Sequence, residues 1–124
     1  MSGSRVLIVD DMARVRRDLR TVLALTGLVD IVGEAGNGEE AVRQAGALRP
    51  DVVLMDLEMP VLDGFAATRR IKANHPAMRV VALTIHSYPS ARIRAFQAGV
   101  DDFIEKGASL EKIIQAIQLK GENS

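Results

Sequence analysis

Short apolar runs, mostly of valine, isoleucine and leucine, alternate along this chain with segments of helical periodicity. The runs lie at residues 6–9, 29–35, 52–55, 79–85 and 102–104. The segments that follow them repeat apolar residues at the three- and four-residue spacing of an amphipathic helix. Strict alternation of this kind predicts an α/β fold, in which a parallel sheet carries helices on both of its faces.

Residues that favour helix ends mark the boundaries of the predicted helices. Asn37, Asp63 and Ser109 each stand where a helix is expected to begin, and their side chains can accept a backbone N–H there. Pro89 suits the first turn of the fourth helix, and Gly99 suits the C-terminal cap of the same helix. These signals complete five strand–helix units with no repeat and no linker between them.

The composition excludes several classes of function. Hydrophobic residues make up 48% of the 124 residues, which is enough for the core of one domain. Sixteen basic and sixteen acidic side chains cancel, which argues against a nucleic-acid surface or a membrane surface. Cysteine is absent, so disulfides and thiolate chemistry are excluded. No apolar run approaches the roughly 20 residues that cross a bilayer, and we expect a soluble, cytoplasmic protein.

Acidic residues follow two of the apolar runs directly. Asp10 and Asp11 come after the first run, and Asp56 ends the unbroken stretch of apolar residues 52–55. If these two strands are neighbours, the three carboxylates converge at one edge of the sheet, and each raises the pKa of the others. A hard divalent cation with oxygen ligands would relieve this repulsion. Mg²⁺ is the natural candidate, because it prefers carboxylates, water and phosphate oxygens.

Two further strand ends supply a hydroxyl and an ammonium group. Thr84 lies near the end of the fourth run, and Lys106 follows the fifth. Carboxylates, a cation, a hydroxyl and a lysine together form a site suited to phosphoryl transfer. Asp56 is placed to attack phosphorus and become an acyl phosphate, and the metal and Lys106 would stabilise the charge on the transferred oxygens.

The motifs resemble those of a known family, the receiver domain of two-component response regulators. The matching motifs are "VDD" at 9–11, "MDLEMPVLDG" at 55–64, "LT" at 83–84 and "EKG" at 105–107, and they occur in the family's order. The resemblance covers residues 5–119, leaves short tails at 1–4 and 120–124, and includes no output domain. It implies a doubly wound, flavodoxin-like sheet of five parallel strands in the order 2-1-3-4-5.

The resemblance implies roles for the acidic residues. Asp56 matches the phosphoacceptor, which would receive a phosphoryl group from a histidine kinase or a phosphotransfer protein. Asp11 matches a direct Mg²⁺ ligand, and Asp10 matches a ligand that acts mainly through water. The backbone carbonyl of Glu58 matches the third protein ligand. Capping of the first helix is an additional function that we expect of Asp10 and Asp11.

The remaining matches imply a conformational switch that follows phosphorylation. Lys106 matches the lysine that pairs with the phosphoryl group, Thr84 the hydroxyl that turns toward it, and Phe103 a rotating aromatic. A buried core role for Phe103 is an equal alternative. Their movement would change the partner affinity of the last two α/β units, including possible homodimerisation of the phosphorylated protein.

Some positions depart from the family's common pattern. Ile85 stands where a small residue is usual and could narrow access to Asp56, and the Glu58 side chain adds negative charge nearby. Gly107 replaces a frequent proline, so we expect a trans peptide there. His86 lies close to where water would reach the phosphoryl group, and a modulating role and a plain loop role are both open.

Four hypotheses about function are compatible with these residues. The favoured hypothesis is a signalling receiver that is no enzyme beyond its own phosphorylation and slow dephosphorylation. The stretch at residues 99–117 is similar to receivers that precede a helix-turn-helix DNA-binding domain, which points to transcription regulation. A stand-alone phosphorelay protein is an alternative. A small Mg²⁺-dependent aspartyl phosphatase and a phosphorylation-independent interaction module are the other hypotheses.

Overall fold

The computed structural model describes residues 3–85 and 88–118, and within those ranges strands and helices alternate strictly. The strands are β1 (Ser4–Val9), β2 (Val29–Ala35), β3 (Val52–Met55), β4 (Arg79–Thr84) and β5 (Asp102–Glu105). The helices are α1 (Ala13–Leu25), α2 (Gly38–Leu48), α3 (Gly64–Asn74), α4 (Pro89–Ala98) and α5 (Leu110–Gln118). All five predicted strands and five predicted helices are therefore confirmed, with small shifts at their ends.

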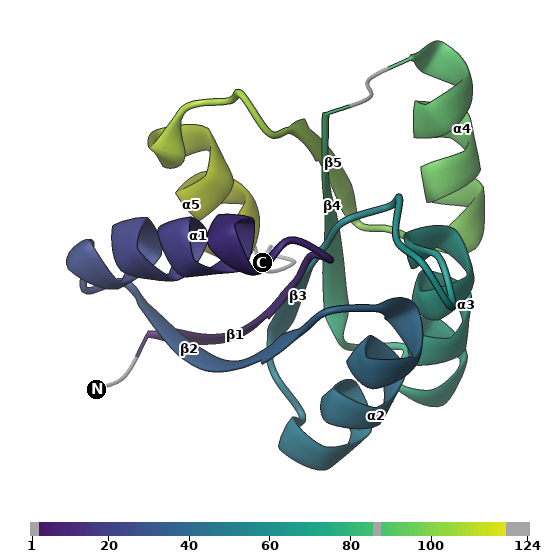
Figure 1. Cartoon of the computed structure of the whole chain (residues 1–124), viewed down its shortest axis with the longest axis horizontal. Coiled ribbons are helices and arrows are strands. Elements are labelled where there is room, and N and C mark those ends of the chain that lie inside the picture. The colour runs from purple at the N-terminus through teal and green to yellow at the C-terminus, as the bar shows by residue number, and fades with distance from the viewer. Residues whose placement is uncertain (1–2, 86–87, 119–124) are drawn as a thin grey trace.

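The strands form one parallel sheet in the order β2-β1-β3-β4-β5. Helices α1 and α5 cover one face, and α2, α3 and α4 cover the other, as Figure 1 shows. This arrangement is the doubly wound fold predicted from the alternation of strands and helices. The strand order places β1 between β2 and β3, so the carboxyl ends of β1 and β3 are neighbours.

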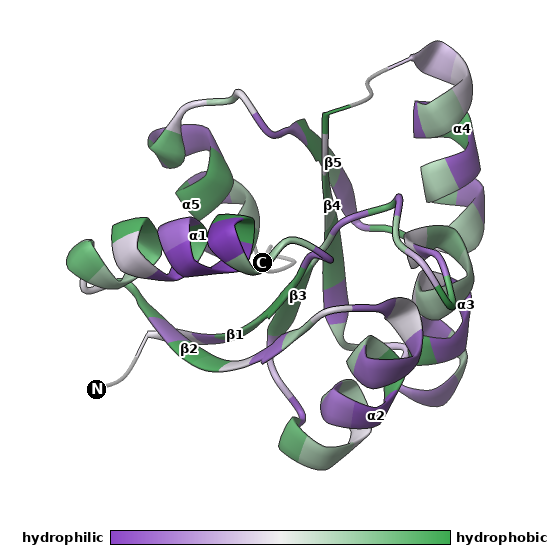
Figure 2. Cartoon of the chain, in the orientation of Figure 1, coloured by the Kyte–Doolittle hydropathy of each residue, from purple (hydrophilic) through white to green (hydrophobic). Residues whose placement is uncertain are grey.

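Side-chain alternation along the central strands divides the core in two. Leu7 and Val53 pack with α2, α3 and α4, whereas Ile8 and Leu54 pack with α1 and α5. Each of these side chains is almost fully buried, which explains why the runs are apolar without a break. Figure 2 shows this concentration of hydrophobic residues in β3 and β4.

The predicted helix ends are confirmed at each marked position. The side chains of Asn37, Asp63 and Ser109 accept the backbone N–H groups of Glu40, Ala66 and Lys112, respectively. Pro89 is in the first turn of α4, and Gly99 ends that helix with φ +111°. A positive φ of this kind is comfortable only for glycine.

One apolar residue of α1 is more exposed than its place in the helical spacing predicts. Val22 belongs to the apolar repeat of α1, yet 41% of its surface is exposed, while Leu23 of the same helix is fully buried. Leu19 and Val22 line a hollow that Ile113 of α5 also lines, so α5 does not cover this side of α1 completely. None of the helices in the described ranges is both long enough and apolar enough to span a membrane.

Candidate functional site

The predicted site residues meet at the carboxyl edge of the sheet. Asp10 and Asp56 directly follow β1 and β3, Thr84 is the last residue of β4, and Lys106 directly follows β5. Parallel strands bring these ends to the same edge, where doubly wound sheets bind their ligands. The register of β1 against β3 pairs Val9 with Met55, so the acids that follow them are adjacent.

Three carboxylates form a compact cluster at this edge. One carboxylate oxygen from each of Asp10, Asp11 and Asp56 lies within 4.8 Å of the other two. Asp10 and Asp56 are 1% and 6% exposed, whereas Asp11 faces solvent. Buried carboxylates in such proximity require positive charge nearby. The cluster has the oxygen-only donor set and the open side that suit a hard divalent cation.

Lys106 supplies positive charge to the two buried acids. Its Nζ atom lies 2.5 Å from Oδ2 of Asp10 and 3.8 Å from Oδ1 of Asp56. The backbone N–H of Lys106 donates to the carbonyl of Thr84 at 2.8 Å. This bond anchors the start of the β5–α5 loop to the end of β4, so the lysine approaches the acids from a fixed backbone position.

Asp56 has a strongly perturbed acidity. Burial is the main cause, the charge of Asp10 adds to it, and together they raise the pKa of Asp56 to about 6. The Lys106 charge and a hydrogen bond from the backbone N–H of Glu58, 3.3 Å from Oδ1, act in the opposite direction. A buried carboxylate whose described partners are a backbone N–H at 3.3 Å and an ammonium at 3.8 Å is less well solvated than one in water. Such a group is a better nucleophile than a hydrated one.

Asp10 has a structural contact in addition to its place in the cluster. Its Oδ1 atom accepts the backbone N–H of Met12 at 2.9 Å, and Met12 is the N-cap residue of α1, with no side-chain cap of its own. Asp10 therefore holds the residue that directly precedes α1, whereas the cap that we expected from Asp10 and Asp11 is not the one observed, because the N-cap of α1 is Met12. The same carboxylate reaches Lys106 through its other oxygen, so both of its oxygens are engaged.

Glycine allows the β3–α3 loop to pass close to Asp56. A Cβ atom on Gly64 would lie 2.1 Å from the backbone oxygen of Asp56, and one on Gly38 would lie 2.1 Å from the backbone oxygen of Leu62. The N–H of Gly64 donates to the carbonyl of Leu57 at 3.0 Å. Two helix N-termini are thus packed against the loop that carries the predicted phosphoacceptor.

The other predicted residues surround this centre at different depths. Thr84 is buried at the end of β4, and the side chain of Glu58 is exposed. Phe103 is buried in the core below α4, and the guanidinium of Arg92 lies 5.7 Å from its ring centre. Their predicted roles in switching and metal binding remain predictions.

Ile85 and the loop after β5 border the site. Ile85 is 70% exposed and lines a hollow of about 500 Å³ together with Lys106 and Gly107. No cis peptide bond occurs in the described residues, so the peptide before Gly107 is trans, as expected. His86 lies outside the described residues.

Arg16 is a site neighbour that sequence reasoning missed. Its Nη1 atom donates to the backbone carbonyl of Asp10 at 2.6 Å, and its Nε atom donates to Glu34 at 3.0 Å. Glu34 is on β2, eighteen residues away in the chain. An arginine on a helix and a glutamate on an edge strand carry no signal that they meet beside Asp10, because the contact depends on the packing of α1 against β2.

Comparison with known proteins gives one consistent result. The family model of the response regulator receiver domain matches residues 6–118. The response regulator GacA of Pseudomonas viridiflava is 43% identical over 115 residues, which are 93% of this chain and 54% of GacA. The chain thus spans about half the length of that relative.

Solved structures agree in fold. A LuxR-family two-component response regulator from Aurantimonas sp. SI85-9A1 superposes with a TM-score of 0.88 and 33% identity, over 94% of this chain and 83% of that one. The receiver domain of the sensor histidine kinase PA1611 from Pseudomonas aeruginosa PAO1 has a TM-score of 0.80 and 33% identity, over 91% and 95%. That structure holds a magnesium ion coordinated in its active-site cleft.

Proposed function

Because this chain belongs to the receiver domain family of response regulators, we propose that it accepts a phosphoryl group on Asp56 from a histidine kinase or a phosphotransfer protein. The observation that carries the proposal is the juxtaposition of three carboxylates with Lys106 at the carboxyl edge of the sheet. Asp56 is the buried member of this group whose pKa is raised to about 6, so it is mostly ionised at neutral pH.

The transfer forms one bond and breaks one. An oxygen of the ionised Asp56 carboxylate bonds to phosphorus, while the bond from phosphorus to the histidine nitrogen of the donor breaks. The departing imidazole keeps the electron pair and leaves as a neutral ring, because its other nitrogen carries a proton. The product is an acyl phosphate on Asp56, and Lys106 is close enough to pair with the negative charge that arrives there.

A magnesium ion fits the donor set of this site. The carboxylates of Asp10, Asp11 and Asp56 and the backbone carbonyl of Glu58 would hold it. Bound Mg²⁺ supplies positive charge that screens the three acids and the phosphoryl oxygens. The fit rests on the oxygen-only cluster with its open side, and the magnesium in the PA1611 receiver domain supports the assignment.

Phosphorylation would then change the surface formed by the last two α/β units. Thr84 is the residue that we assign to contact the phosphoryl group, and Phe103 is the aromatic that we assign to follow it. Both are buried: Thr84 is the last residue of β4, and Phe103 packs in the part of the core that includes Ala95 and Ala98 of α4. A homodimer through this surface is the partner that we propose for the phosphorylated state.

Transcription regulation is the output that we propose for the parent protein. The support is the similarity of residues 99–117 to receivers that precede a helix-turn-helix domain, the likeness to a LuxR-family regulator, and the fact that the chain spans 54% of GacA. The described chain itself would bind no nucleic acid, and we place its activity in the cytoplasm. A stand-alone phosphorelay protein is the alternative.

Intact-mass spectrometry tests the proposal. The wild type and Asp56→Asn are incubated with phosphoramidate or acetyl phosphate and Mg²⁺. We expect one added phosphoryl group on the wild type and none on Asp56→Asn. Equal labelling of both proteins would show that Asp56 is not the acceptor. Because exposed Ile85 borders the site and could hinder small donors, a phosphorylated kinase domain is used as a second donor.

Turnover distinguishes the signalling proposal from a phosphatase. We expect the phosphorylated protein to lose its phosphoryl group slowly and not to process a small phosphomonoester repeatedly. Release of many equivalents of inorganic phosphate from such a substrate would instead support an aspartyl phosphatase. The measurement is phosphate released per mole of protein over time, with Asp56→Asn as the blank.

A further inference from the structure

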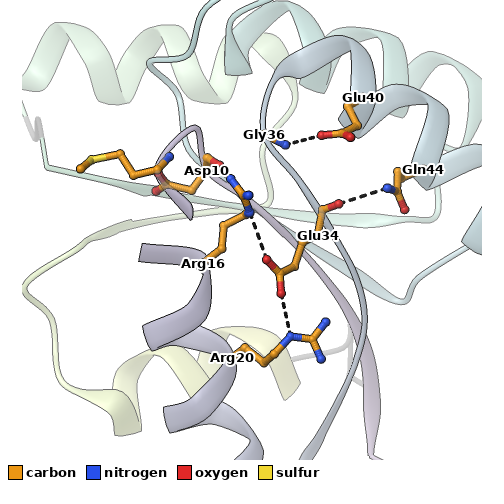
Figure 3. A network of polar contacts seen from close by, with 8 residues as sticks. Asp10, Arg16, Arg20, Glu34, Gly36, Glu40 and Gln44 are labelled. Carbon is orange, nitrogen blue, oxygen red and sulfur yellow. Dashed lines mark hydrogen bonds and ion pairs between the residues drawn. The ribbon is translucent and has the colours of Figure 1, made fainter. Parts of the chain in front are cut away.

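A network of polar contacts connects α1 and β2 to the loop that carries Asp10 and Asp11. Figure 3 shows Arg16 and Arg20 on α1 reaching the two carboxylate oxygens of Glu34 on β2. The distances from the two Nε atoms are 3.0 Å and 2.7 Å. Within this network, Arg16 also donates from Nη1 to the backbone carbonyl of Asp10, at 2.6 Å.

The peptide that joins Asp10 to Asp11 is held through this carbonyl. The peptide group is planar, so fixing the carbonyl of Asp10 also fixes the direction in which the chain enters Asp11. On the other side of Asp10, its N–H donates to the carbonyl of Ala35 at 3.0 Å. The backbone of Asp10 is therefore anchored to β2 in two ways. Its N–H bonds directly to Ala35, and its carbonyl is linked to Glu34 through Arg16.

The anchor itself is rigidly supported. The carbonyl of Glu34 accepts a hydrogen bond from the side chain of Gln44 on α2, at 3.1 Å. Hydrogen bonds from Arg20 first, and from Arg16, hold the pKa of Glu34 below its ordinary value, so its carboxylate stays ionised. A Cβ atom on Gly36 would lie 3.4 Å from Nη1 of Arg16, an ordinary van der Waals distance, so the guanidinium lies directly beside the backbone that follows β2.

We propose that Arg16 is a positioning residue, which orients Asp10 and Asp11 for metal binding by holding the peptide between them. The inference rests on the proposed function, since it concerns the same acidic cluster. Arg16 does not contact the carboxylates in any interaction described above, and it acts through the backbone. Arg20 also donates to Glu34, but within the described residues it makes no hydrogen bond or ion pair with Asp10. It therefore serves as the control residue, which binds Glu34 without holding the Asp10 peptide.

The direction in which Mg²⁺ affinity changes when Arg16 is replaced distinguishes a positioning role from a purely electrostatic one. Removing a positive charge near an acidic cluster should tighten the binding of a cation. Removing a backbone anchor should weaken it, because the two carboxylates must then be ordered at the moment of binding. If a variant that has lost a positive charge binds Mg²⁺ more weakly, the cause is therefore the lost orientation of the carboxylates and not the lost charge.

The experiment compares Arg16→Gln, Arg20→Gln and Arg16→Lys with the wild type. Each ¹⁵N-labelled protein is titrated with Mg²⁺ alone, and the dissociation constant is obtained from amide shifts around Asp11 and Asp56. We expect Arg16→Gln to bind Mg²⁺ roughly tenfold more weakly, at the lower end of the range of about 10–100-fold for supporting residues of metal sites. Arg20→Gln should bind within about twofold of the wild type or slightly more tightly.

Two further readouts make the result decisive. Arg16→Lys keeps the charge and can still donate to the Asp10 carbonyl, so it should recover part of the lost affinity. The unfolding temperature without metal should fall for both Arg16→Gln and Arg20→Gln, because each loses one partner of Glu34, and somewhat further for Arg16→Gln, which also loses the bond to the Asp10 carbonyl. A loss of Mg²⁺ affinity that merely follows stability in both variants would show that the role is structural.

The outcomes also separate this inference from the proposed function. If the wild type shows no Mg²⁺-dependent shifts around Asp56, the metal-assisted function itself fails. If the wild type binds Mg²⁺ and Arg16→Gln binds it equally or more tightly, only the positioning role of Arg16 is overturned. If Arg16→Gln weakens Mg²⁺ binding while Arg20→Gln does not, the result supports both the proposed function and the positioning role of Arg16.

Discussion

Asp56 illustrates at the scale of one residue how function conflicts with stability. In the metal-free protein, burial and the Asp10 charge raise the pKa of Asp56 to about 6. The unfolded chain titrates this group near the ordinary value of about 4. Between these pH values the native state binds more protons than the unfolded state, so the free energy of unfolding falls as the pH rises through this window.

We therefore expect Asp56→Asn to stabilise the metal-free protein above this window. The neutral amide avoids the burial of a charge, and the gain should be about 1–3 kcal/mol near neutral pH. In the acid part of the window the difference should shrink, because Asp56 is then protonated in the wild type. Urea unfolding in a chelating buffer over a pH series measures this.

The control for this prediction is Asp30→Asn, which removes a carboxylate from the exposed surface of β2. It should change stability by no more than about 0.5 kcal/mol. Equal pH profiles for the wild type and Asp56→Asn would mean that Asp56 ionises in the folded protein as it does in the unfolded chain. Added Mg²⁺ should stabilise the wild type by favouring the folded state that binds it.

At the scale of elements, the start of α3 is fixed against the segment that holds Asp56. A Cβ atom on Gly64 would meet three backbone atoms of Asp56 and Leu57, between 2.1 and 3.0 Å away. Backbone atoms cannot rotate aside as a flexible side chain can. We expect Gly64→Ala to lower the free energy of unfolding by about 1–3 kcal/mol, the usual cost of overpacking, and to slow phosphorylation by moving the β3–α3 loop.

Gly46→Ala is the matched substitution with the opposite expected sign. Gly46 lies in the last turn of α2, and its Cβ would meet only the far end of the His75 side chain, at 3.9 Å. Alanine is the better helix former, so this variant should gain about 0.5–1 kcal/mol. Chemical unfolding and the phosphorylation rate are measured for both. Unchanged stability of Gly64→Ala would contradict the close approach.

The success of sequence reasoning at this scale has a physical basis. Apolar runs with two buried faces, caps such as Asn37, and acids at strand ends are local signals, so the fold and the meeting of Asp10 with Asp56 were predictable. The bond from Arg16 to the Asp10 carbonyl and the close backbone approach at Gly64 depend on how elements pack, which local sequence signals do not show. The partial exposure of Val22 was not predictable for the same reason. The periodicity of α1 marks its apolar face but does not reveal how much of that face α5 covers.

At the scale of the whole molecule, α4 carries an exposed apolar surface. Ile93 is 58% exposed, and Tyr88 and Phe96 are also exposed on this element or directly before it. Phe103 lies beneath the same helix, with Arg92 of α4 over its ring. Movement of Phe103 on phosphorylation would therefore be transmitted to the surface that we propose for the homodimer.

We expect Ile93→Glu to weaken dimerisation of the phosphorylated protein at least about tenfold, because an apolar contact is replaced by a charge. Leu25→Glu is the matched control. Leu25 is 83% exposed at the end of α1, on the opposite face of the sheet from α4. Sedimentation velocity of the phosphorylated proteins gives the dimer affinity, and intact mass confirms equal phosphorylation. If Leu25→Glu abolishes the dimer and Ile93→Glu does not, the partner surface lies on the side of α1, and the coupling from Phe103 through α4 is not how the domain signals its phosphorylation.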